Sequence, residues 1–257
     1  MKICFITTLI GKDKNNIDKI GNFETFNNEN YDFFLFTNLK DIKHDCWKVI
    51  YLENDFLDEQ IKNKEKNNSR DFFIYKSRFI KFMGWKYIKE NLKKNYDVIF
   101  YCDAILSPNK NIDWEFFANK IKNSESGLLQ KKHPNNTTPY SECSYMFKCK
   151  KETLKKCRNM SNYLHKKKVP LDYIITENTS FGFDPSNIKI INAFTDFWET
   201  YIREKITYRD QPLWGYISYK NNLNPVYENN LHETLSNNKN LMFQYTGTSF
   251  NISRTYY

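Results

Sequence analysis

One short stretch of the chain places three polar side chains of different chemistry before an apolar run. In "TYRDQPLWGYISYK", residues 207–220, Arg209, Asp210 and Gln211 stand directly before Pro212. An arginine neutralises anionic groups, a carboxylate accepts hydrogen bonds or a proton, and an amide both donates and accepts. Proline suits the first turn of a helix, and an aspartate before it is an ordinary N-cap. The triplet therefore predicts a ligand site, a capped helix, or both.

A second candidate is a lone carboxylate that directly follows an apolar run. In "VIFYCDAIL", Asp103 ends a series of mostly apolar residues. Burying a carboxylate is costly unless it is paired, hydrogen-bonded or bound to a metal. We expect Asp103 to contact a metal ion or a sugar-phosphate; a helix cap or a loop position is the alternative. Upstream, Lys76 and Arg78 are expected to open a helix whose N-terminus favours phosphate, or else to form a solvated face.

The elements that must position these residues follow from the apolar patterns. Apolar, β-rich runs predict strands at residues 2–11, 31–38, 47–54, 96–106, 126–133 and 188–194, and helices are expected at residues 76–92, 144–163 and 212–220. Strands that alternate with helices predict an α/β fold with a mostly parallel sheet. Ligands of such sheets bind beyond the carboxyl ends of the strands. Thr7, Thr37 and Asn38 lie at predicted strand ends and are expected to contact the ligand.

Composition limits the classes of function. The 257 residues, 40% hydrophobic, suit one domain with a large core, and the net charge of +9 favours phosphate-bearing partners. The lysines are spread along the chain and no nucleic-acid motif occurs. There is no GxGxxG fingerprint and no P-loop. The six cysteines form no CxxC pair, no window is apolar enough to span a membrane, and no secretion signal is evident. We therefore expect a cytoplasmic protein with reduced cysteines.

Several segments in order resemble glycosyltransferases of the GT-A type. The first are "YDFFLFTN", "YKSRFIKF" and "YDVIFYCDAIL". In that fold, a strand ending in an acidic motif, often Asp-x-Asp, holds a divalent cation and the donor diphosphate. The later segments "KKHPNNTTPYSEC", "VPLDYIITENTSFGF" and "FTDFWETYIREKITYRDQ" are similar to a glycosyltransferase-like family first described as a domain of unknown function. That family includes plant proteins linked to mucilage polysaccharide and a branch named alkaline ceramidase.

The resemblance covers about residues 31–220 and implies a fold and an activity. The fold is a single GT-A-like, Rossmann-like domain over residues 1–257, with a nucleotide-sugar half at 1–110 and an acceptor half at 111–257. The activity is transfer of a sugar from a nucleotide-diphospho-sugar, such as a UDP-sugar, to a hydroxyl acceptor on a glycan, polysaccharide or glycoprotein. Asp210, Glu177 and Glu142 are the expected catalytic carboxylates. The other expected substrate contacts are His133, Trp198, Arg209, Gln211, Asp103, Lys76 and Arg78; a structural hydrogen-bonding role is the alternative for His133.

The acidic motif also raises the question of a metal. Asp103 is followed by Ala104 and Ile105, so the motif has one carboxylate where the family often has two. A Mn²⁺ or Mg²⁺ ion with Asp103 as ligand is the expectation. Two other functions stay open: an amide-lipid hydrolase, suggested by the ceramidase branch but unsupported by any GxSxG or zinc motif, and a non-catalytic sugar- or nucleotide-binding module.

Overall fold

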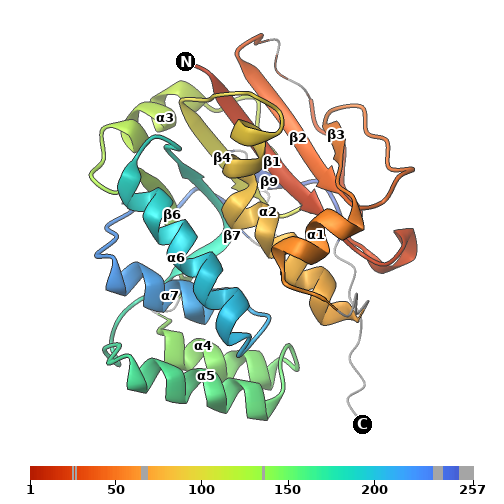
Figure 1. The fold of residues 1–257 in the computed structure, drawn as a ribbon. Helices are drawn as coiled ribbons and strands as arrows, with labels where there is room; N and C mark the ends of the chain where they lie inside the picture. Colours follow the sequence, from red (N-terminus) through yellow and green to blue (C-terminus); the bar gives the residue numbers. More distant parts are fainter. Residues whose placement is uncertain (25, 27, 65–68, 135–136, 234–239, 249–257) are drawn as a thin grey trace.

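The computed structural model describes all residues except 25, 27, 65–68, 135–136, 234–239 and 249–257 (Figure 1). Seven strands form one sheet in the order β3-β2-β1-β4-β7-β6-β8. Only β7 runs against its neighbours β4 and β6, and the other neighbouring strands of the sheet are parallel. The strands of the sheet are β1 (Ile3–Leu9), β2 (Tyr31–Thr37), β3 (Lys48–Tyr51), β4 (Val98–Cys102), β6 (Leu128–Lys132), β7 (Thr176–Phe183) and β8 (Val226–Tyr227).

Helices cover both faces of this sheet and leave one helical pair at its edge. The helices are α1 (Asn54–Gln60), α2 (Arg70–Glu90), α3 (Trp114–Lys122), α4 (Pro139–Lys148), α5 (Leu154–Lys166), α6 (Ile188–Glu204) and α7 (Gln211–Lys220), with a short 3-10 turn, η1 (Lys14–Asn16). On one face α2 packs on β1 and on α6, while α3 packs on β4 and β7. Helices α4 and α5 pack against each other and against α7, at the lower end of the molecule in Figure 1. The predicted α/β fold, with a mostly parallel sheet flanked by helices, is confirmed.

The central strands are buried on both sides, which explains why they read as continuous apolar runs. All seven residues of β1 and all five of β4 are buried. A parallel strand covered by helices on both faces needs apolar side chains at every position. One core cluster lies between the sheet and α2, α6 and α7, and a second lies on the opposite face around Phe5, Phe100 and Trp114.

A short second ribbon closes over the loop that follows β4. Strand β5 (Leu106–Pro108) pairs with β9 (Phe243–Tyr245), and the backbone N–H of Thr246 donates to the carbonyl oxygen of Ile105 at 3.1 Å. The N–H of Asp103 donates to the carbonyl oxygen of Thr179 on β7 at 2.9 Å. Backbone hydrogen bonds from two different segments therefore hold the loop of residues 103–105.

Three predicted elements were wrong. Residues 188–194 form the first turns of α6 and not a strand, because Ile190, Phe194 and Phe197 are buried at helical spacing. Residues 144–163 are two helices with a break between Lys148 and Leu154, rather than one. Helix α2 begins at Arg70, so the expected cations at 76 and 78 lie about two turns inside it and not at its N-terminus. Among the described residues, no helix is long and apolar enough to cross a membrane.

Candidate functional site

A cavity of about 500 Å³ lies where β1 and β4 end. Its wall combines the end of β1 and the turn after it, including Thr8 and Gly11, with Ser77 on α2 and Asp103 after β4. Arg209, from the segment before α7, completes it. This is the position at which parallel sheets bind ligands. Its volume lies within the range of small-molecule sites, about 300–1,000 Å³.

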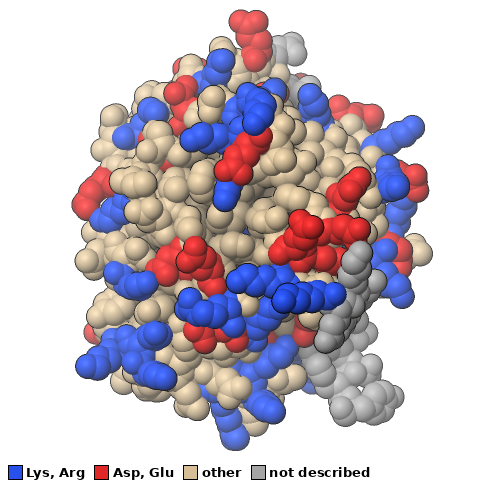
Figure 2. All heavy atoms as spheres, viewed as in Figure 1, with Lys and Arg blue, Asp and Glu red and all other residues tan. Residues whose placement is uncertain are grey.

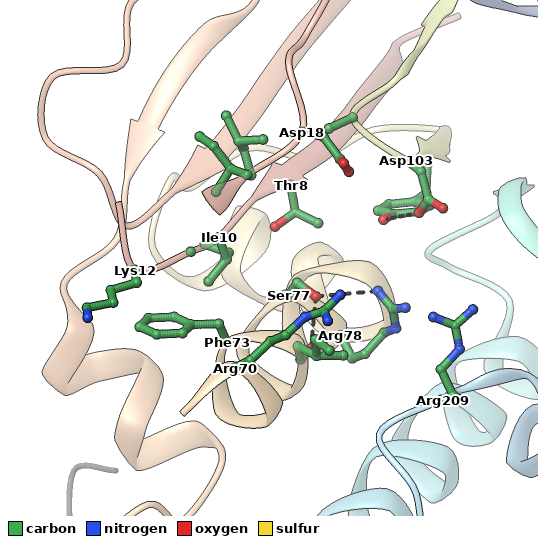
Figure 3. Close-up of a pocket in the computed structure, with 16 residues that line it drawn as sticks. Thr8, Ile10, Lys12, Asp18, Arg70, Phe73, Ser77, Arg78, Asp103 and Arg209 are labelled. Carbon is green, nitrogen blue, oxygen red and sulfur yellow. Dashed lines mark hydrogen bonds between the residues drawn. The ribbon is translucent and has the colours of Figure 1, made fainter. Parts of the chain in front are cut away.

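The cavity separates cationic from anionic side chains. Figure 3 shows the guanidinium groups of Arg70, Arg78 and Arg209 on one side and the carboxylates of Asp18 and Asp103 on the other. Lys12 also lines the cavity, but its ammonium points away from the three arginines in this view. Arginine suits the binding of phosphate groups, because each guanidinium offers a planar fork of donors.

Arg78 is held in place by a buried ionic network. Its Nε donates to Asp210 Oδ1 at 2.9 Å, and Lys81 Nζ lies 3.2 Å from Asp210 Oδ2 and 3.4 Å from Asp103 Oδ1. The hydroxyl of Tyr101 donates to the same Asp103 oxygen at 2.8 Å. The side chains of Lys81 and Asp210 are 2% and 7% exposed, so both charges depend on these partners.

This network changes the role expected of Asp210. Its side chain makes no capping hydrogen bond to α7, so the alternative of a simple N-cap is wrong. Burial by itself disfavours the carboxylate, but the charges of Arg78, Lys81 and Arg209 hold its pKa well below the usual value. A carboxylate so strongly stabilised in its charged form is a weak base. Asp210 thus holds two cations in place: Arg78, which lines the cavity, and Lys81, which lies behind the cavity wall.

Of the polar residues at the strand ends, some line the cavity and others hold its wall in place. Thr8 faces the cavity, is 8% exposed, and its buried hydroxyl has no hydrogen-bond partner among the described residues. Asn38 accepts from the N–H of Gly11 at 3.0 Å and donates to its carbonyl oxygen at 2.9 Å, which fixes the turn lining the cavity. Thr37 accepts from the N–H of Leu39, and Thr7 is fully buried. Of the four, only Thr8 lines the cavity, and Asn38 supports it from behind.

Lys76, Trp198 and Gln211 also lie outside the cavity wall. Lys76 is fully buried and pairs with Asp58 at 2.9 Å, so it supports α1 and α2 and does not line the cavity. Trp198 is in the core, with its ring 5.3 Å from that of Phe79. Gln211 is the partly buried first residue of α7 and is not part of the cavity wall.

A second polar cluster contains Glu142, on the inner face of α4. Its Oε2 is buried, without a hydrogen bond among the described groups, and lies 3.7 Å from Nε2 of His133. His133 Nδ1 lies 3.0 Å from the carbonyl oxygen of Pro134, which only accepts, so Nδ1 carries a proton. If the ring of His133 is neutral, Nε2 carries no proton. The contact between Nε2 and Glu142 is then attractive only if a proton lies on Nε2 or on the carboxyl group of Glu142. Burial raises the pKa of Glu142, against the opposing charges of His133 and Arg209.

The pKa of Glu177, on β7, is shifted in the direction opposite to that of Glu142. His232 Nε2 lies 3.0 Å from its carboxylate, and the other ring nitrogen, Nδ1, lies 2.7 Å from the hydroxyl of Ser180. Burial would raise the pKa of Glu177, but the hydrogen bond from His232 and the charge of Lys131 lower it. The charge of His133 acts on both Glu142 and Glu177. Two carboxylates whose pKa values are shifted in opposite directions are typical of sites that divide acid–base roles.

Arg209 connects the cavity with the second cluster. It lines the cavity, and its charge helps to lower the pKa of Asp210 and opposes the rise that burial causes in the pKa of Glu142. Glu142, Glu177 and His133 do not line the cavity themselves. The cavity wall combines residues from both of the expected halves of the chain.

The residues around Asp103 do not form a cage for a divalent cation. One carboxylate oxygen of Asp103 already accepts from Tyr101 and faces the ammonium of Lys81, whose charge opposes a second cation there. Within the part of the chain that the structure describes, no group of three His, Cys, Asp or Glu side chains could hold a metal ion. We therefore assign no step to a metal, and the expected role of Asp103 as a metal ligand does not fit this donor set.

Sequence reasoning missed several of these residues. Lys81 had only a weak signal: it stands within the apolar run "FIKFM", but in a helix such a lysine can also lie on the exposed face. Arg70 would have been found had the helix been extended to its true start. Asp18 and His232 lie in irregular segments, where no local pattern marks them.

Comparisons with known proteins add a remote likeness of fold. No family model matches the chain, and no curated protein matches it. Among solved structures, the apo form of mouse xyloside xylosyltransferase 1 is similar with a TM-score of 0.46 and 10% sequence identity, over 87% of this chain and 83% of that one. A likeness this remote carries no conclusion about activity. The resemblance to a particular glycosyltransferase-like family stays a prediction.

Proposed function

We propose that this protein is a glycosyltransferase that moves a sugar from a nucleotide-diphospho-sugar to a hydroxyl acceptor. The observation that carries the proposal is the cavity itself, in which Arg70, Arg78 and Arg209 face Asp18 and Asp103 at the carboxyl ends of parallel strands. A diphosphate needs converging cations, and a sugar needs hydrogen-bond acceptors beside it. The cavity offers both within a volume suited to one small ligand.

In this proposal the arginines stabilise the leaving group. The bond between the sugar's anomeric carbon and the diphosphate oxygen breaks, and the acceptor oxygen forms a new bond to the same carbon. Arg78 and Arg209 stabilise the negative charge that develops on the departing diphosphate oxygen. Fixed cations in a partly dry site stabilise such charge without reorganising, which lowers the barrier. Arg78 is preorganised because Asp210 holds its Nε at 2.9 Å. Thr8 offers its unpartnered hydroxyl to the ligand.

The proton of the acceptor hydroxyl then goes to a carboxylate. Glu142 suits this role better than Asp210 or Glu177, because its pKa is raised while theirs are lowered. A general base works best with a pKa near the working pH. His133, 3.7 Å from Glu142, provides a second group that can share the proton. Glu177, held charged by His232, is assigned to binding hydroxyl groups of the acceptor.

The experiment that tests the proposal is a melting-temperature screen with nucleotides and nucleotide-sugars, with and without manganese and a chelator, followed by a donor-turnover assay on each ligand that binds. A ligand at 100 times its Kd adds about 2.7 kcal/mol of stability. Arg209→Gln should weaken binding about tenfold to 150-fold, because a hydrogen bond to a charged group contributes about 1.5–3 kcal/mol. Arg203→Gln is the matched control, since Arg203 lies on the exposed end of α6.

The outcomes separate the three functions. Binding with turnover that depends on Arg209 supports a transferase. Binding without any turnover, with or without candidate acceptors, favours a binding module. Cleavage of an amide lipid in the absence of nucleotide favours the hydrolase. If no nucleotide or nucleotide-sugar raises the melting temperature, the proposal is wrong.

A further inference from the structure

One segment of the chain, in the hairpin of α4 and α5, carries a large excess of positive over negative charge. Residues 148–168 contain nine Lys or Arg residues and one acidic residue, Glu152, in a chain whose net charge is +9. Figure 2 shows Lys and Arg side chains over the lower end of the molecule, where Figure 1 places these two helices. The exposed cations of this segment are Lys148, Lys150, Lys155, Arg158, Lys166, Lys167 and Lys168.

The acidic residue does not offset this charge at the surface. Glu152 is 2% exposed and accepts hydrogen bonds from the N–H of Thr153 and the hydroxyl of Thr207. Lys156 is turned inward and pairs with Asp71 of α2 at 3.0 Å. The outward face of the hairpin therefore presents positive charge alone.

The same face carries exposed apolar side chains and a groove. Tyr145, Phe147 and Leu154 are 50%, 46% and 40% exposed. A groove of about 450 Å³ runs between α4 and α5, with Phe147 and Leu154 in its wall. Lys148 and Arg158 line the same groove. Apolar surface flanked by cations on a helical pair is the composition of segments that lie in the interface of a membrane.

We propose that the α4–α5 hairpin docks on an anionic lipid membrane. Phe147 and Leu154 enter the boundary between headgroups and acyl chains, while Lys148 and Arg158 contact phosphate groups of the lipids. Each cation near an anionic leaflet contributes about 1 kcal/mol, and the attraction is screened by salt. The inference is independent of the glycosyltransferase proposal, because the residues of this groove are distinct from those of the cavity.

A membrane suits this surface better than a nucleic acid does. Beside Phe147 and Leu154, the groove is lined by the thiols Cys143 and Cys157, which are weak donors, and by the polar residues Ser144, Ser161 and Asn162. Most of the surface that the groove exposes is nevertheless apolar. Nucleic acids are bound through many hydrogen bonds to phosphates and through grooves whose walls are polar or stack on bases. An acyl chain requires no hydrogen bonds and fills an apolar groove.

Flotation of the full chain with lipid vesicles tests the proposal. The vesicles are phosphatidylcholine alone, and phosphatidylcholine with phosphatidylglycerol at roughly 7:3, in about 0.1 M and about 1 M NaCl. We expect binding to the anionic vesicles at low salt only. The double variant Lys148→Gln/Arg158→Gln should bind about 25-fold more weakly, from about 1 kcal/mol for each cation. Phe147→Ser/Leu154→Ser should lose about tenfold or more.

The matched controls replace the same kinds of side chain outside the hairpin. Lys43→Gln/Lys89→Gln removes two exposed cations outside the hairpin, and Phe116→Ser/Ile188→Ser removes two exposed apolar side chains. Both controls should bind like the wild type, and all variants should keep their melting temperatures. Equal binding to neutral and anionic vesicles, an equal loss in the controls, or salt-sensitive binding to a short DNA duplex without vesicle binding would each overturn the proposal.

Discussion

Replacing Asp210 by serine separates two roles that the sequence left open. Serine caps a helix about as well as aspartate, so a cap would leave stability nearly unchanged. The structure gives Asp210 a different role: it is 5% exposed and lies 2.9 Å from Arg78 and 3.2 Å from Lys81. Removing one partner from a buried ionic network costs about 3–5 kcal/mol, because the remaining charges lose their compensation.

The expected change in melting temperature follows from that free energy. A chain of this length loses about 2–4 °C for each kcal/mol, so Asp210→Ser should melt about 6–20 °C lower than the wild type. Scanning calorimetry or near-UV circular dichroism measures it. Asp113→Ser is the matched control, because Asp113 does cap a helix, accepting from the N–H of Phe116 at 3.0 Å. If the melting temperature falls as little for Asp210→Ser as for Asp113→Ser, the assignment of Asp210 to a buried ionic network is refuted.

The pH dependence provides an independent check. The pKa of Asp210 is lowered in the folded protein, so its contribution to stability is complete above the unfolded value of about 3.9 and is lost as the pH falls through the folded value. The difference in unfolding free energy between wild type and Asp210→Ser should therefore be constant from about pH 7 to pH 5 and should narrow at lower pH. A difference that is unchanged down to the acid transition would argue against the network.

Three further predictions address the site, the packing and the cysteines. Glu142→Gln should lower kcat/KM about 10²–10⁴-fold with little change in melting temperature. In the wild type, kcat/KM should fall on the acid side at a pH above the ordinary pKa of glutamate, because burial raises the pKa of Glu142, and this fall should be absent in the variant. Gly182→Ala should destabilise the protein by about 1–3 kcal/mol in urea titrations, since a Cβ there would lie 2.5 Å from the ring of Phe100. Thiol titration in denaturant without reductant should find all six cysteines free; a recovery of four would reveal a disulfide.

Much of the sheet could be predicted from the sequence. The strands β1 and β4 each have an apolar sequence, because a strand buried on both faces needs apolar side chains throughout, and the same holds for the last four residues of β2. Asp103 could be identified as a candidate because it follows such an apolar run, where a carboxylate is costly to bury without a partner. Pro212 marked the start of α7 through its fixed backbone angle.

Local patterns failed where two structures suit the same residues. Residues 188–194 are rich in isoleucine, which favours strands over a short window. The helix is evident only over its full length, where Ile190, Phe194 and Phe197 share one face and Asn187 caps the first turn. Short apolar runs do not distinguish a strand from a buried helix, so packing against α2 and α7 decided the outcome.

The sequence by itself determined which residues carry charge into apolar surroundings, and the tertiary structure decided which of them meet. Arg78 and Asp210 are 132 positions apart, and Lys81 joins them from within an apolar helix face. Lys76, only two positions before Arg78, pairs with Asp58 instead. A buried charge requires a partner, but the requirement does not specify one, because any opposite charge within a few ångströms satisfies it. Only the packing of α2 against the end of β4 and the start of α7 selects Asp210, and so turns an apparent helix cap into the support of a cationic site.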